Sequence, residues 1–243
     1  MSQTELIEID ELVAEIDARM RALPSLKIES MRDVRREFSK RLARTSPQVV
    51  IAVALRLLEL DRNGTGYRFV AFELVCHHRA ALSSLGEKEL ELFGQGNDSW
   101  DDVDTFACYL AGPAWRQHQV PDELIHRWAR SDDRWRRRTA LVCTVALNNK
   151  ARGGSGDTAR TLEVCRILIK DRDDMVVKAM SWALRELSGR DPQAVRAFLL
   201  EHEGMFAPRV VREVNTKLTT GLKNPHRKVD ISLSERDITN VHQ

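Results

Sequence analysis

Apolar residues recur along most of the chain at the three- and four-residue spacing of an α-helix. The two clearest apolar stripes are Leu6, Ile9, Val13, Ile16 and Met20, and then Met31, Val34, Phe38 and Leu42. No stretch shows the alternation of apolar and polar residues that is typical of a strand. The pattern therefore predicts an all-α protein.

Capping residues, prolines and glycines divide this pattern into short helices. The expected helix starts are a Ser2-x-x-Glu5 capping box, Ser46-Pro47, Pro121, Asp132-Asp133, Asp157, Asp173-Asp174, Asp191-Pro192 and Pro208. Gly112-Pro113 is expected to end the helix that begins near Trp100, and one helix is expected over 67–82. The glycines between Lys150 and Gly156 predict a flexible loop.

One segment of the chain repeats at an interval of forty residues. Asp132-Asp133-Arg134 through Ala140 resembles Arg172-Asp173-Asp174 through Met180. An acidic cap followed by a basic residue on the second helix of a pair is typical of HEAT-like repeats. We therefore expect a curved α-solenoid with a basic concave face, lined by Arg138 and Lys178. The prediction is one domain over 1–223, with a polar C-terminal tail over 224–243.

Composition excludes several classes of protein. The 243 residues are 42% hydrophobic and 30% charged, as in a soluble globular protein. No apolar run reaches the length of a membrane span, and the N-terminus has no signal-peptide pattern. The four cysteines are far apart in apolar runs, which predicts buried free thiols. No metal-ligand spacing occurs, so we expect neither a metal nor a cofactor.

Charge is unevenly distributed, although the net charge is only +2. Residues 115–153 contain nine basic and four acidic residues, and residues 205–229 contain six basic residues and one acidic residue. A charge run is usually a solvated helix face. Two basic blocks in an otherwise balanced chain favour a phosphate-bearing partner.

The stretch from Asn97 to Phe106 is the strongest candidate for chemistry. Asn97 or Asp98 is a plausible N-cap, and a helix from Trp100 places Trp100 and Asp104 on one face, four residues apart. One interpretation is structural, with Trp100 packed inward and Asp104 favoured by the helix dipole. The other is an exposed indole beside a functional carboxylate.

Three segments in this order resemble the AlkD family of bacterial alkylpurine DNA glycosylases, which are built from HEAT-like repeats. They are Trp100-Asp101-Asp102-Val103-Asp104, Ile125 through Arg138, and Lys178-Ala179-Met180-Ser181-Trp182-Ala183-Leu184-Arg185-Glu186. The resemblance runs from about Gly66 to Gly221 and is specific between Trp100 and Glu186. It is weak before Gly66, and the loop from Lys150 to Gly156 departs from it.

The resemblance implies a role for each matched residue. Asp104 matches the catalytic carboxylate, and Trp100 and Trp182 match the indoles that pack on the deoxyribose. Expected DNA contacts are Arg138, Arg136, Arg137, Lys178, Arg209 and Arg212. It also implies a monomer that acts on alkylated double-stranded DNA in the cytoplasm of a bacterium, associated with the nucleoid through DNA.

These residue types suit the excision of cationic N3- or N7-alkylated purines. Such a base leaves without protonation, so a carboxylate needs only to stabilise an oxocarbenium-like sugar and orient water. Indole faces attract cationic carbon. Because the chain has two tyrosines in all and its matched tryptophans have a sugar-facing role, we expect no base-flipping pocket. Two alternatives are a catalytically silent DNA-structure-binding protein and a protein-binding HEAT scaffold. Salt-dependent DNA binding and release of alkylated bases would distinguish the three.

Overall fold

The computed structural model describes residues 3–62 and 64–223, and every regular element within them is helical. The α-helices are α1 (Gln3–Arg21), α2 (Ile28–Leu42), α3 (Pro47–Leu60), α4 (Tyr67–Cys76), α5 (Arg79–Ser83), α6 (Glu87–Gly94), α7 (Trp100–Phe106), α8 (Gly112–Arg116), α9 (Asp122–Ala129), α10 (Arg134–Asn148), α11 (Thr158–Ile167), α12 (Asp174–Ser188), α13 (Pro192–Glu201) and α14 (Pro208–Thr220). A π-helical segment, η1 (Ala107–Ala111), joins α7 to α8, and a 3₁₀ turn, η2 (Lys150–Arg152), follows α10. Ser2 and the tail over 224–243 lie outside the described residues.

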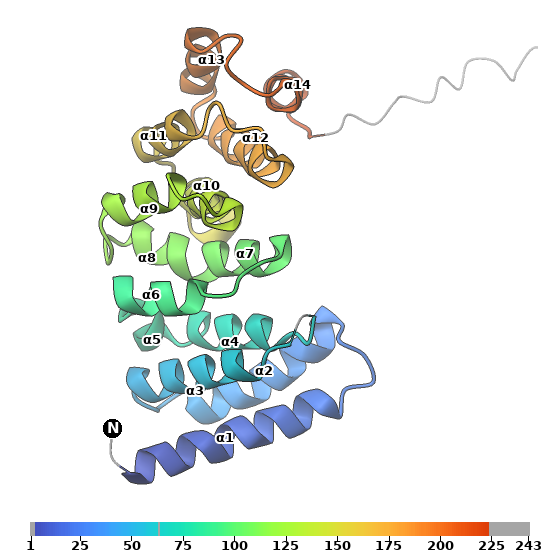
Figure 1. The fold of residues 1–243 in the computed structure, drawn as a ribbon, viewed down its shortest axis with the longest axis vertical. Coiled ribbons are helices and arrows are strands. Elements are labelled where there is room, and N and C mark those ends of the chain that lie inside the picture. Colours follow the sequence, from blue (N-terminus) through green and yellow to red (C-terminus); the bar gives the residue numbers. More distant parts are fainter. Residues whose placement is uncertain (1–2, 63, 224–243) are drawn as a thin grey trace, which may run out of the picture.

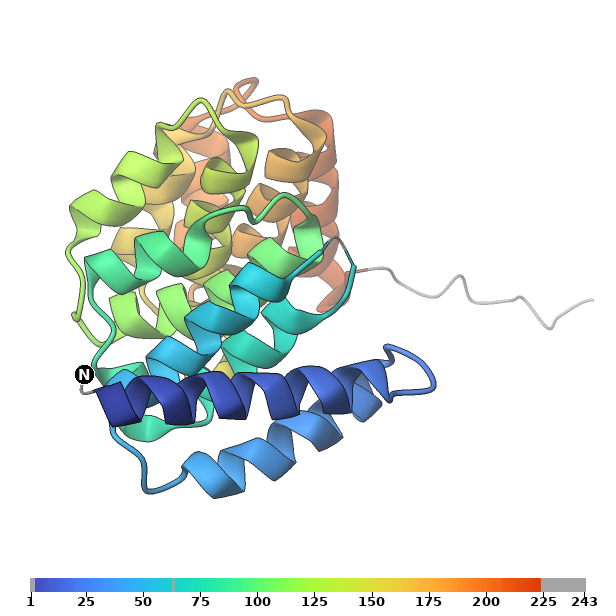
Figure 2. The same cartoon turned by 60° about the horizontal axis from the view of Figure 1, so that its bottom comes forward.

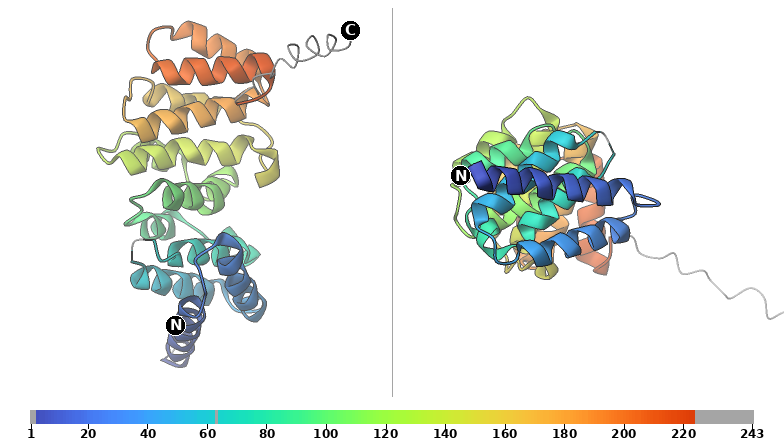
Figure 3. Two further views of the ribbon diagram at one scale, coloured as in Figure 1. Left: turned by 90° about the vertical axis from the view of Figure 1, so that its right-hand side faces the viewer. Right: turned by 90° about the horizontal axis from the view of Figure 1, so that it is seen from below.

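The helices stack as pairs in two rows (Figure 1). We call α2, α4, α7 with η1 and α8, α10, α12 and α14 the second row, because they are the later members of their pairs and each contacts the next. Figure 3, left, looks onto this row, with α10, α12 and α14 lying side by side. Helix α1 lies across the opposite end of the stack (Figure 2). The expected all-α, HEAT-like solenoid is confirmed, and the basic concave face stays a prediction.

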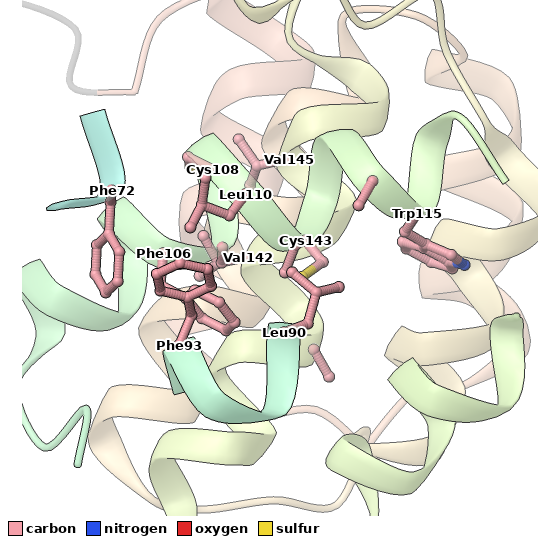
Figure 4. Close-up of a cluster of buried hydrophobic side chains, with 14 of the residues drawn as sticks. Phe72, Leu90, Phe93, Phe106, Cys108, Leu110, Trp115, Val142, Cys143 and Val145 are labelled. Carbon is pink, nitrogen blue, oxygen red and sulfur yellow. The ribbon is translucent and has the colours of Figure 1, made fainter. Parts of the chain in front are cut away.

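The apolar stripes form one continuous core from Ile9 to Val214. Beneath α7, the rings of Phe72, Phe93 and Phe106 meet, with centroids 5.7 Å apart for Phe72 and Phe106 (Figure 4). Phe106 is fully buried. Since Phe106 closes α7, this packing fixes the helix that carries Trp100 and Asp104. Cys108, Cys143 and Cys165 are buried free thiols, as expected, whereas the free thiol Cys76 is only partly buried.

The single helix expected over 67–82 is wrong. The chain leaves the helical conformation at His78, which is extended (φ −108°, ψ 98°) and caps α5 by accepting a hydrogen bond from the Ala81 backbone N–H at its Nδ1 (3.1 Å). A histidine side chain that satisfies a backbone donor can replace one helical bond, and the apolar period does not reveal it.

Gly112-Pro113 does not end the helix, contrary to expectation. The segment η1 widens the helix, so that the Gly112 N–H donates to the carbonyl of Ala107, five residues back, and α8 continues beyond Pro113. A π-turn lets a proline enter a helix because the missing donor falls at the start of a new turn. Gly112 is required here, since a Cβ would lie 2.6 Å from the Cβ of Ala146 on α10.

The loop after α10 is held in place rather than free. Lys150–Arg152 form a 3₁₀ turn, and the carbonyl of Arg152 accepts a hydrogen bond from Arg116 Nη1 (2.8 Å). Gly153 adopts φ +81°, and a Cβ on Gly154 would lie 2.6 Å from the carbonyl oxygen of Leu147. The glycines therefore allow one tight path along α10 instead of conferring flexibility.

Candidate functional site

An open cleft of about 430 Å³ lies on the second row, between α7, α10, α12 and α14. We call it the indole cleft, because both Trp100 and Trp182 line it. Its basic lining residues are Arg138, Lys178, Arg185, Arg209 and Lys223. The cleft thus gathers two indoles from separate repeats and an excess of positive charge.

Helix α7 presents Trp100 to solvent. Ser99, and neither Asn97 nor Asp98 as expected, is the N-cap, because its Oγ accepts the Asp102 backbone N–H. Asn97 is instead buried and accepts a hydrogen bond from Arg68. Trp100 remains 58% exposed, so the interpretation in which it packs inward is wrong. An exposed indole at the rim of a cleft is available to a ligand.

Asp104 forms a bidentate ion pair with Arg138 across the two helices. Arg138 Nε donates to Asp104 Oδ1 (2.9 Å), and Arg138 Nη2 donates to Asp104 Oδ2 (2.8 Å). The side chains are 7% exposed for Arg138 and 18% for Asp104. This fork geometry fixes the plane of the carboxylate and leaves one lone pair on each oxygen.

Two opposing effects act on the pKa of Asp104. Burial raises the pKa above its usual value, and the hydrogen bonds and charge of Arg138 oppose that shift. The balance is a raised pKa. Desolvation therefore disfavours the charged form of Asp104. Where that charge is present, water screens it only weakly.

Arg138 has donors to spare. Its Nη1 donates to the carbonyl of Met175 in the first turn of α12 (2.6 Å), in addition to the two bonds to Asp104. A guanidinium has five N–H groups, so two remain. Since Arg138 lines the indole cleft, an anion there can accept hydrogen bonds from the same residue that orients Asp104.

A hydrogen-bonded chain orients the indole of Trp182. Its Nε1 donates to Glu186 Oε1 (3.1 Å), one helical turn later on α12. Glu186 Oε2 accepts from Asn149 Nδ2 (3.1 Å), and Asn149 caps the η2 turn. The indole is therefore held by contacts at its polar edge while it lines the cleft.

The other expected DNA contacts on α12 and α14 share carboxylates at the edge of the cleft. Lys178 and Arg209 both pair with Asp174, and Arg209 Nε also contacts Glu213 (3.1 Å). These pairs are partly exposed, so water and salt compete with them. Arg212 is exposed on α14 and does not line the cleft.

The structure does not bring Arg136 and Arg137 to the cleft. Arg136 Nη1 lies 3.0 Å from Glu91 Oε2, and its guanidinium covers the ring of Trp128. Arg137 Nε donates to Asp171 (2.7 Å). Both residues join α10 to neighbouring segments of the described chain, and their expected contact with DNA stays a prediction.

Sequence reasoning missed four cleft residues, which are Met175, Arg185, Glu213 and Lys223. Arg185 is mostly buried, and its Nε donates to Ser181 (3.2 Å), while Ser181 donates to Glu213 (2.6 Å). Burial lowers the pKa of Arg185. Its three-residue distance from Trp182 places both on one helix face, which was the available signal.

Two features are absent from the described residues. No group of histidine, cysteine, aspartate and glutamate side chains within 3–62 and 64–223 could hold a metal ion. In the same residues, none of the helices combines the length and apolarity that crossing a bilayer requires.

Comparison with known proteins gives one match. The sequence profile of the family described as DNA alkylation repair enzyme matches residues 20–218, which include both indoles, Asp104 and all the basic lining residues except Lys223. No curated protein and no solved structure matches the chain.

Proposed function

Because the chain belongs to the DNA alkylation repair enzyme family, we propose that it is a DNA glycosylase that excises cationic N3- and N7-alkylated purines from double-stranded DNA. The observation that carries the proposal is the placement of Trp100, Trp182 and Arg138 around one cleft, with Arg138 holding Asp104. The protein acts as a monomer in the cytoplasm, bound to the DNA of the nucleoid.

The reaction breaks the bond between C1′ of the sugar and the purine nitrogen. The bond electrons leave with the base and neutralise its positive charge, so no general acid is needed. The sugar becomes oxocarbenium-like, and water adds to C1′ with loss of a proton. Asp104 stabilises the positive sugar and orients the water through the lone pairs that Arg138 leaves free.

Arg138 serves both parts of this mechanism. Its bonds to Asp104 keep the carboxylate in place before DNA arrives, and preorganisation of this kind avoids rearrangement during the reaction. Its two remaining N–H groups donate to a phosphate of the bound strand. Because that phosphate offsets the positive charge of Arg138, the negative charge of Asp104 can stabilise the positive sugar.

The openness of the indole cleft supports excision without base flipping. Enzymes that extrude a base hold it between aromatic rings and read its edge with hydrogen bonds. Here the indole nitrogen of Trp182 is already bonded to Glu186, and the polar lining groups of the cleft are mostly cationic. Cations suit the phosphates and not a positively charged base, so selection rests on the weak bond of a cationic purine.

The decisive experiment is incubation of the protein with duplex DNA containing N7-methylguanine or N3-methyladenine. We expect the free modified base and an abasic site, detected by chromatography and by alkaline strand cleavage. Salt-dependent binding to this DNA without base release would support the silent DNA-binding alternative instead. Absence of DNA binding would leave a protein-binding scaffold.

A further inference from the structure

A second basic cluster involves η1, α2 and the loop after α10, and its residues do not line the indole cleft. Its central residue is Arg152, in the loop where the resemblance to the AlkD family breaks. The guanidinium of Arg152 lies over the ring of Tyr109, 5.2 Å from its centroid. Among residues 3–62 and 64–223, no carboxylate lies within ion-pair distance of Arg152, so its guanidinium forms no salt bridge there.

Helices α2 and α4 add a second uncompensated charge to this cluster. Arg32 Nε and Arg35 Nε both donate to Glu73, at 2.9 and 3.0 Å. The side chain of Glu73 is only 2% exposed, whereas that of Arg32 is 38% exposed. Two arginines therefore share one buried carboxylate, which leaves one surplus positive charge. Arg32 is the more exposed of the two and presents this charge to solvent.

Tyr109 joins the two parts of the cluster. Its hydroxyl accepts a contact from Arg32 Nη2 at 3.5 Å, and its ring carries Arg152. No described residue accepts the hydroxyl proton of Tyr109, which leaves a neutral donor between two cations. Two guanidinium groups flanking a hydroxyl donor match the oxygens of a phosphate.

The cluster is rigid before any ligand binds. Arg116 holds the carbonyl of Arg152, Asn149 Oδ1 accepts its backbone N–H (3.2 Å), and the path through Gly153 and Gly154 is restricted to glycine. Little backbone entropy is therefore lost when Arg152 contacts an anion.

The cluster and the indole cleft lie along one run of helices. Arg32 belongs to α2, whereas Tyr109 and Asp104 belong to η1 and α7, which form one member of the second row; α4 contacts both α2 and that member. Burial raises the pKa of Asp104, and the charge of Arg152 is close enough to oppose that shift. Asp104 thus lies near a cation of this cluster as well as Arg138 of the indole cleft.

We propose that Arg152, Arg32 and the Tyr109 hydroxyl form a second phosphodiester-binding site, which holds the DNA backbone outside the indole cleft. The inference rests on the proposed function for its choice of duplex DNA as ligand. It assigns a DNA contact to the loop that departs from the family pattern. The site supplies affinity and register and reads no base.

Binding of an undamaged DNA duplex tests the site without requiring catalysis. Fluorescence anisotropy over a range of salt concentrations compares the intact protein with Arg152→Gln, Tyr109→Phe and Arg166→Gln. Arg166 is the matched control, because it also lies over a ring (Phe198, 5.6 Å) without an ion pair, but on α11 in the other row. Thermal melting of each variant checks that it is folded.

Loss of one phosphate contact lowers the salt slope by about 0.9. The ratio of dissociation constants, Arg152→Gln to wild type, should therefore fall about 3.5-fold when salt rises fourfold. Arg166→Gln should match wild type, and Tyr109→Phe should weaken binding with an unchanged slope. A duplex that is shortened from one end should at some length no longer reach Arg152. Wild type and Arg152→Gln should then bind that duplex with equal affinity.

The outcomes separate this inference from the proposed function. Equal salt slopes for wild type and Arg152→Gln, or an equal loss in Arg166→Gln, overturn the second site. An Arg152→Gln defect that does not depend on duplex length also overturns it, since a backbone contact is lost once the duplex no longer reaches Arg152. Wild-type protein that shows the Arg152 effect but releases no alkylated base contradicts only the glycosylase proposal.

Discussion

Replacement of Asp104 by asparagine should separate chemistry from binding. The substitution keeps the shape of the side chain and one acceptor oxygen, but removes the negative charge and one of the two hydrogen bonds from Arg138. Base release should fall by about 10²–10³, the usual effect of removing one preorganised electrostatic group.

The same change should weaken the fold and strengthen DNA binding. A lost hydrogen bond to a charged group costs about 1.5–3 kcal/mol. For a domain of this size, each kcal/mol lowers the melting temperature by about 2–4 °C, so we expect a decrease of about 3–12 °C. Arg138 loses its counter-charge, so a DNA phosphate gains a stronger partner, and the salt slope should steepen by up to about 0.9.

Three measurements decide the outcome: single-turnover release of N7-methylguanine, anisotropy of undamaged duplex, and thermal melting. Asp101→Asn is the matched control, since Asp101 lies in the first turn of the same helix, is exposed, and carries the same charge. Asp101→Asn should release base at nearly the wild-type rate. Excision by Asp104→Asn at the wild-type rate, or an equal loss in Asp101→Asn, would refute the catalytic role.

Further predictions concern the surroundings of the carboxylate. Base release requires ionised Asp104, so the rate should fall as pH decreases through the raised pKa of Asp104. Arg138→Gln removes the group that lowers this pKa, so the acid limb of the pH–rate profile should move to higher pH. Glu186→Ala frees the indole of Trp182 and should slow base release about fivefold, the equivalent of about 1 kcal/mol, without changing the salt slope. Arg137→Gln breaks an ion pair within the protein and should lower the melting temperature more than it lowers DNA affinity. Uracil should not be excised from duplex DNA, whereas bulky cationic purine adducts should be excised. Efficient removal of uracil would exclude the proposed mechanism.

The helical stack was predictable because its core depends on a pattern that is local in sequence. Stripes such as Met31, Val34, Phe38 and Leu42 are all buried in α2, where the spacing places them. The prediction failed where a helix was altered by a side chain or by a wider turn. Neither the cap by His78 nor the π-turn before Pro113 changes the apolar period that the prediction uses.

The ion pair of Asp104 and Arg138 could not be predicted in the same way. The two residues are 34 positions apart, and each has neighbours of the same charge within a few positions. Which carboxylate meets which guanidinium depends on how far α10 is rotated against α7, and burial of the apolar face sets that rotation. Sequence could place the two groups on adjacent helices, but it could not pair them.

The geometry of α10 also explains why fewer cations face DNA than the run of basic residues in its sequence indicates. Arg136, Arg137 and Arg138 are consecutive, so their side chains leave α10 about 100° apart. They reach three different carboxylates, on α6, in the segment before α12 and on α7. Arg152, in the glycine-rich loop after α10, forms no ion pair with any described residue. The measured salt slope should therefore depend more on uncompensated cations such as Arg152 than on the block that gives this region its basic composition.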